Sequence, residues 1–215
     1  MANVKQQLES PSIPSLGFPP EAYERRHFNE NYGALNNYFR KLTTVLGSLF
    51  GPRGGKFMNN PYGAFQSTVD QTAAVINTAY AMTLNTVDYA NGVSVASNSR
   101  ITVADAGIWN LQWSGQFENT DSQDHDVRVW LKINGTVVTG STGFFATPSK
   151  HGSVDGHTLV GWNYFLSLNA NDYVELWWET DSTMVSIQAY AAAGNYPSTA
   201  SLIATMTFVS NLPTI

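Results

Sequence analysis

The chain has 215 residues, of which 13% are charged and 13% aromatic, and it carries a net charge of −5 and no cysteine. The charged fraction is about half of the 25% usual for soluble domains, and the acidic balance excludes a basic surface that could neutralise nucleic-acid phosphates. Without cysteine, stability has to come from packing or oligomerisation and not from disulfides or thiolate-bound metal.

The chain opens with a proline-rich segment, residues 1–20. Pro11, Pro14, Pro19 and Pro20 favour extended backbone and forbid a stable helix. The segment lacks the apolar core of a signal peptide, and no later apolar run approaches the roughly 18 residues of a membrane span. We therefore expect an extended docking arm that lies on a neighbouring subunit, and no membrane insertion.

An amphipathic helix is predicted over residues 21–50. Pro20 suits its first turn, and Glu21 and Glu24 suit its positive end. Apolar side chains recur at alternating spacings of four and three, the pattern of a helix that packs against other helices. We call these positions the helix seam: Phe28, Tyr32, Leu35, Phe39, Leu42, Leu46 and Leu49. A glycine-rich hinge over residues 51–59 is expected to follow.

From residue 60 the hydrophobic period changes to two. Trp109, Leu111 and Trp113 alternate with polar neighbours, which predicts a half-buried antiparallel strand. Predicted strands cover residues 64–68, 80–87, 100–103, 107–117, 126–133, 136–141, 158–168, 172–179, 184–191 and 201–209. About ten strands without intervening helices predict a mainly β fold, an antiparallel jelly-roll sandwich over residues 60–215.

Several predicted strands are apolar on both faces. Trp130 points away from Val129 and Leu131, and the adjacent Trp177 and Trp178 must face opposite ways. One face fills the core, so the other needs a second cover. Burial between identical subunits is the simplest one.

Three stretches resemble the jelly-roll domains of complement globular heads and tumour necrosis factor. Residues 107–111 (Gly-Ile-Trp-Asn-Leu) resemble the Gly-x-aromatic-x-apolar strand of that family, and residues 127–133 lead into an Asn-Gly pair where it places a hairpin. Residues 168–176 are similar to its Leu-x-x-Gly-Asp-x-Val-x-Leu element, with Asn171 in place of Gly, a residue that tolerates left-handed backbone. The resemblance implies a compact trimer around a three-fold axis.

The N-terminal part is similar to a narrower group. Residues 18–23 and 35–42 look like the leader helix of small tailed-phage structural proteins, in which such a helix precedes a jelly-roll head. This likeness implies a subunit of a virus particle.

Four residues of one predicted loop could bind a cation. Asp121, Asp124, His125 and Asp126 place acidic oxygens close together, but the loop lacks the Gly and terminal Glu of an EF-hand. We expect a solvated hairpin loop. Calcium sites near the trimer axis of some relatives keep the alternative open.

A second loop could imitate a hydrolase triad. His151 and His157 flank a glycine-rich stretch beside Lys150, and Ser149 or Ser153 could serve as nucleophile. No nucleophile elbow is present, so we expect an exposed loop.

Two further patterns fit known chemistry in part. Glu175 and Glu179 are four apart on one strand, which permits the 5–10 Å that glycosidases need between carboxylates. Residues 51–56 resemble a phosphate-binding loop, but one residue is missing between the glycines and Phe57 replaces the magnesium-binding Ser or Thr. We expect no catalytic residue, cofactor or metal from either.

These observations predict a homotrimeric virion structural protein of a tailed bacteriophage. It would be a fibre or spike for host attachment, with an exposed head anchored to other virion proteins by arm and helix. The head loops would meet a host-surface glycan or protein. A capsid decoration or head-fibre protein is the close alternative. A glycan hydrolase on a phage spike and a secreted cytokine-like ligand are alternatives from other classes, and the missing cysteine and signal sequence argue against the ligand.

Overall fold

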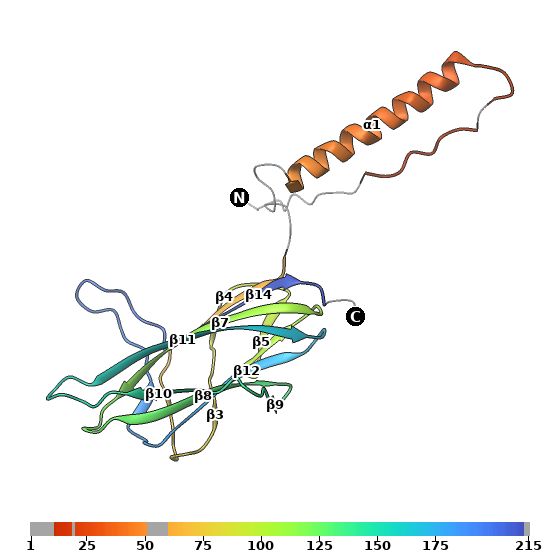
Figure 1. Ribbon diagram of the computed structural model, residues 1–215. Helices are drawn as coiled ribbons and strands as arrows, with labels where there is room; N and C mark the ends of the chain where they lie inside the picture. The colour runs from red at the N-terminus through yellow and green to blue at the C-terminus, as the bar shows by residue number, and fades with distance from the viewer. Residues whose placement is uncertain (1–10, 19, 51–59, 213–215) are drawn as a thin grey trace. The chain divides into compact units, whose positions relative to one another are not determined.

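The chain divides into two compact units, Met1–Asn59 and Asn60–Ile215 (Figure 1). A computed structural model describes residues 11–18, 20–50 and 60–212. The expected hinge over residues 51–59 and the first half of the expected arm lie outside these residues. Each unit is described by itself.

The first unit contains helix α1, Arg25–Phe50. It starts later than the predicted residue 21, because the Glu24 carbonyl accepts the first helical bond, from the Phe28 amide at 3.1 Å. Arg26 in the first turn opposes the helix dipole, and its ion pair with Glu30 at 2.8 Å offsets this.

The described part of the arm lies on its own helix. The Gly17 amide donates to Asn31 Oδ1 at 3.3 Å, and a Cβ at Gly17 would come within 3.0 Å of the His27 ring. Further along, Pro11 and Ser12 border a groove shared with the middle of α1. These contacts lie within the chain, and contact of the arm with a neighbouring subunit stays a prediction. The chain reverses direction between the arm and α1, which explains the late helix start.

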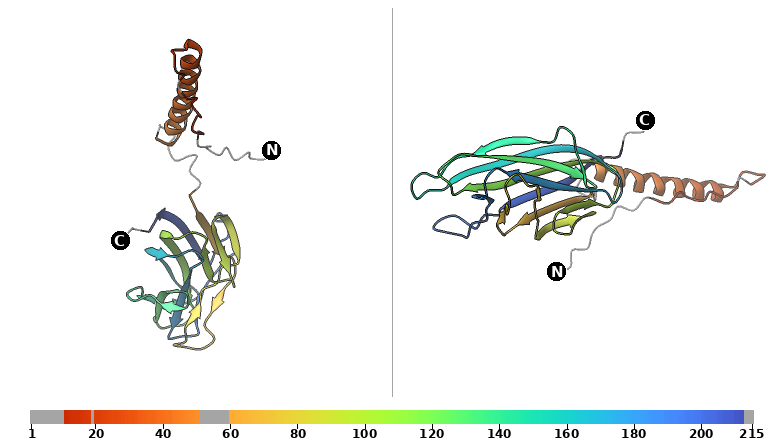
Figure 2. Two further views of the ribbon diagram at one scale, coloured as in Figure 1. Left: turned by 90° about the vertical axis from the view of Figure 1, so that its right-hand side faces the viewer. Right: turned by 90° about the horizontal axis from the view of Figure 1, so that it is seen from below.

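The second unit is an antiparallel β-sandwich of two sheets (Figures 1 and 2). Sheet A has the order β2-β13-β7-β14-β1-β4 with β11 on β7. Sheet B has the order β10-β8-β12-β6-β5 with β3 on β12 and β9 on β8. The strands are β1 (Tyr62–Ser67), β2 (Gln71–Thr72), β3 (Tyr80–Ala81), β4 (Thr86–Asn91), β5 (Val93–Ala96), β6 (Arg100–Val103), β7 (Gly107–Asn119), β8 (His125–Ile133), β9 (Thr136–Val137), β10 (Gly143–Thr147), β11 (Gly156–Leu168), β12 (Tyr173–Thr180), β13 (Val185–Ile187) and β14 (Leu202–Ser210).

Strand β7 forms the centre of sheet A. It pairs with β11 over thirteen residues, from Gly107 opposite Leu168 to Asn119 opposite Gly156, and with β14 and β13 on its other edge. Trp109, Leu111 and Trp113 are buried, so the alternation predicted for this strand is confirmed.

The core lies between the two sheets. Phe117 of sheet A meets Trp178 of sheet B edge to face, with ring centroids 5.9 Å apart, and Phe145 at 4.8 Å. Trp178 is buried while its neighbour Trp177 faces outward. This confirms the prediction that these adjacent residues of one strand face opposite ways. Aromatic pairs of this geometry stabilise a core beyond their buried area.

Several predicted strands differ from the structure. The predicted strand 80–87 is split into β3 and β4, and the strand 136–141 shortens to β9 because Gly140 turns the chain with a φ of 80°. Strand β10 was not predicted, since its adjacent Phe144 and Phe145 show no alternation. Pairing with β8, with Phe144 opposite Arg128, makes it a strand.

Candidate functional site

The outer face of sheet A carries exposed apolar side chains. Leu159 and Phe165 of β11 are 68% and 65% exposed, and Ile203 of β14 is 46% exposed. In register they lie beside uncharged residues of β7, with Leu159 opposite Gln116 and Phe165 opposite Asn110. We call Leu159, Phe165 and Ile203 the apolar sheet face. These side chains are available for contact with another protein surface.

On the outer face of sheet B, two aromatic rings carry a cation from the same chain. The Lys132 ammonium lies 3.4 Å from the Trp177 ring centroid, and the Arg128 guanidinium lies over Phe144 at 5.2 Å. Arg128 also pairs with Glu179 at 2.9 Å. Trp177 of β12 is thus covered in part by a side chain of its own chain, and burial of these strands between subunits stays a prediction.

Strand β11 is also an open edge. In the described part of the chain it pairs with β7 alone. Two aromatics lean from it toward β10: Trp162 stacks on Tyr164 at 5.7 Å, and the Tyr164 hydroxyl donates to the Ser141 carbonyl at 2.9 Å. Burial raises the pKa of Tyr164. Trp162 remains 43% exposed, so the apolar surface continues from the sheet face around this edge.

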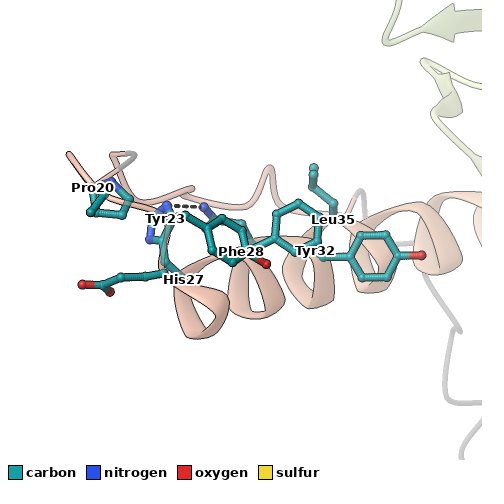
Figure 3. Close-up of a pocket in the computed structure, with 9 residues that line it drawn as sticks. Pro20, Tyr23, His27, Phe28, Tyr32 and Leu35 are labelled. Atoms are coloured by element: carbon teal, nitrogen blue, oxygen red, sulfur yellow. Dashed lines mark hydrogen bonds between the residues drawn. The ribbon is translucent and has the colours of Figure 1, made fainter.

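The helix seam is uncovered in the isolated chain. Phe28, Tyr32 and Phe39 are each more than half exposed. Phe28 stacks on Tyr32 with ring centroids 6.3 Å apart. Figure 3 shows these two rings and Tyr23 at the start of α1. They line a groove of about 400 Å³, which is also bordered by His27 and Asn31, whose Nε2 and Nδ2 atoms lie 2.9 Å apart. The seam thus has exposed aromatics that another protein surface could cover.

The loop that was expected to be a solvated hairpin, with a cation site as the alternative, is held together by His125. His125 Nε2 lies 2.8 Å from Asp121 Oδ2, and its Nδ1 lies 3.0 Å from Asp181 Oδ1. The hydrogen bond from His125 lowers the pKa of Asp121. Asp124 accepts the Ser149 amide at 2.7 Å, and Asp126 is exposed. Over the described residues, no set of three metal-ligating side chains converges. Sequence spacing could not indicate Asp181, because only the fold brings it to this loop.

The second predicted loop separates into different elements. Lys150 Nζ pairs with Asp155 at 3.3 Å, and His151 forms a tight bridge with Val154. His157 lies on β11 and not in a loop. Within the described residues, neither His contacts Ser149 or Ser153, so no triad is assembled.

His157 belongs to a polar cluster that spacing did not indicate. The Tyr190 hydroxyl donates to Glu118 Oε2 at 2.7 Å and lies 3.1 Å from His157 Nδ1. Burial, together with this carboxylate, raises the pKa of Tyr190. The cluster fixes the orientation of the Tyr190 ring.

The paired carboxylates of β12 each have their own partners. Glu175 is 6% exposed, accepts the Ser99 hydroxyl at 2.7 Å and lies 3.7 Å from Arg100. Glu179 pairs with Arg128. Two carboxylates engaged in this way are structural partners of neighbouring side chains, and no open glycosidase pair faces a cleft here.

No protein-family model matches the chain, and no curated protein matches it in sequence. Helix α1, the helix of the described residues, is not apolar enough to cross a membrane. Function therefore has to be inferred from the apolar sheet face and the helix seam.

Proposed function

We propose that this chain is the subunit of a homotrimeric fibre or spike on a tailed-bacteriophage particle. The sandwich is the exposed head that attaches to the host, and the arm and α1 anchor it. One observation carries the proposal: both units present uncovered apolar surfaces, the sheet face on one and the helix seam on the other. Each of these two surfaces could be covered by another copy of the chain or by another protein of the particle.

The head is proposed to be a jelly roll. In support, the main strands pair in nested order: β1 with β14, β6 with β12, β7 with β11 and β8 with β10. In this order the first strand pairs with the last, and each inner strand pairs with its counterpart from the other end. A Greek-key ribbon that folds over on itself produces this order.

Assembly through sheet A supports a closed ring. The apolar sheet face and the β11 edge are different surfaces, so matching one to the other on a neighbour makes a head-to-tail contact, which gives a ring where the rotation between neighbours closes and a filament where it does not. The family resemblance implies three members. Burying Leu159 and Phe165 contributes about 1.5–3 kcal/mol each, which offsets at most the low end of a typical association cost of about 4–15 kcal/mol. The contact must therefore extend over Ile203 and Trp162.

The assembly is tested by one substitution on each sheet. Wild-type protein should sediment as three times 23.5 kDa. Phe165→Asp places a carboxylate in the proposed contact and should shift the protein to monomers at micromolar concentration. Val137→Asp changes a similarly exposed apolar residue of sheet B and should leave the trimer intact. A monomeric wild type, or equal effects of both changes, would contradict the proposal.

The location on the particle distinguishes fibre from capsid decoration. An arm, a helix and a trimeric head suit either attachment point. Cryo-EM of particles with a labelled C-terminus should show density at the tail for a fibre or spike. Label spread over the capsid faces would favour a decoration protein, and no label on purified particles would exclude both.

A further inference from the structure

A hairpin over residues 188–200 stands out from the sandwich, as the blue loop on the left of Figure 1. Tyr190 and Thr199 exchange backbone hydrogen bonds at 3.1 and 2.8 Å, and Ala193 and Tyr196 exchange two more at 3.2 Å. Gly194 turns the chain with a φ of 58°. No residue from 182 to 215 is charged. The hairpin is therefore ordered and electrically neutral.

A groove of about 530 Å³ lies between this hairpin and the end of β1. Its walls are tied together: the Ser201 amide donates to the Ser67 carbonyl at 2.9 Å, and the Ser201 hydroxyl donates to the Val69 carbonyl at 2.7 Å. The Ala189 amide donates to Asp70 Oδ1 at 2.9 Å. Because these bonds join both walls, the groove is preformed, as binding sites usually are.

The lining combines three kinds of group. Asp70 presents a carboxylate whose Oδ2 has no hydrogen-bond partner among the described residues. Gln66, whose Nε2 donates to Asp88 Oδ1 at 2.6 Å, adds its amide oxygen, and Ser198 adds a hydroxyl. Tyr190 adds a ring held in place by Glu118 and His157. None of the lining residues is Lys, Arg or His.

We propose that this groove binds a neutral saccharide of the host surface. Sugar hydroxyls donate to a carboxylate oxygen and exchange hydrogen bonds with amides and hydroxyls, while the C–H face of a pyranose packs on an aromatic ring. One carboxylate and no cation disfavour phosphorylated or acidic sugars, and a single carboxylate is too few ligands for a cation. This site rests on the attachment role proposed above and names its ligand class.

Saturation-transfer NMR on the full chain tests the site. The probes are glucose, galactose, mannose and N-acetylglucosamine, with sialic acid as the anionic counter-probe. At least one neutral sugar should give a signal and sialic acid should not. Asp70→Asn keeps an acceptor for the Ala189 amide and replaces the free oxygen by a donor, so affinity should fall at least tenfold. Tyr190→Ala should weaken binding similarly.

One variant serves as a control. Asp105→Asn removes a carboxylate outside the groove and should change nothing. Absence of a signal from every neutral sugar with folded protein, or a signal that survives Asp70→Asn and Tyr190→Ala, overturns the inference. Host adsorption that resists periodate oxidation of surface glycans would overturn it in favour of a protein receptor. In each case, the proposed function would still hold if the wild-type protein forms trimers and is present on particles.

Discussion

Gly143 leaves no space for a side chain at the edge of the sandwich. A Cβ at this position would overlap the Trp162 indole. Because glycine has only a hydrogen in place of Cβ, Trp162 of β11 can lie against β10. The close approach of these two strands joins the sheets at the edge where we place the subunit contact.

Gly143→Ala should therefore destabilise the head. Displacing the indole costs about 1–3 kcal/mol, as overpacking does, and should lower Tm by several degrees in differential scanning calorimetry. Trp162→Ala removes the obstructing ring, so adding Gly143→Ala to it should have little further effect. Additive losses in the double variant would show that the overlap is not the cause.

Asp172 makes the stability of the head depend on pH in acid. It accepts Asn134 Nδ2 and the Asn169 amide, both at 2.7 Å, and these bonds lower its pKa. The ionised form favours the folded state, so this contribution is complete above the ordinary Asp pKa of about 3.9. It is lost as pH falls through the lower folded value.

Asp172→Asn tests this sign. At pH 7 it should cost about 1 kcal/mol, or about 2–4 °C in Tm, because one carboxylate oxygen becomes a donor facing the Asn169 amide. The difference from wild type should shrink below about pH 4 in thermal melts. Asp105→Asn, at a carboxylate without a hydrogen bond in the described structure, should show no difference. A gap that widens in acid would contradict the assignment.

At the level of elements, α1 depends on what covers its seam. Leu42 lies at the centre of the seam and is half-buried, while Asn36 is exposed. An isolated helix gains little stability from propensity alone, so most of its stability must come from packing.

Leu42→Asp should detach or disorder the first unit, since burying an uncompensated charge costs several kcal/mol. The sandwich should keep its melting behaviour, because the two units are separate. Circular dichroism at 222 nm and limited proteolysis would report the loss. Asn36→Asp should be tolerated, and equal mild effects at both positions would mean that the four–three spacing is accidental.

At the level of the whole molecule, a protein that begins at Asn60 should fold and form the trimer. The core and the apolar sheet face lie entirely beyond this residue. It should be absent from purified particles, because arm and helix are missing. Immunoblots of particles from a complemented deletion would measure this. Normal occupancy by the truncated protein would show that the first unit is not the anchor.

Features that depend on neighbours along the chain were predictable from sequence. The alternation of β7, the heptad spacing of α1 and the sandwich class follow from local periodicity. The Asn-Gly turn is present as Asn134 with a φ of 50° and Gly135 with 82°, and Asn171 adopts the left-handed φ of 68° expected for it.

Contacts between distant residues were decided by the tertiary structure. The partner of His125 is Asp181, and Lys132 covers Trp177. The second of these contacts covers an outward-facing ring of sheet B from within the chain. Periodicity reports that a side chain is apolar and which way it points. It does not report what packs on it, because that depends on pairings between residues far apart in the chain.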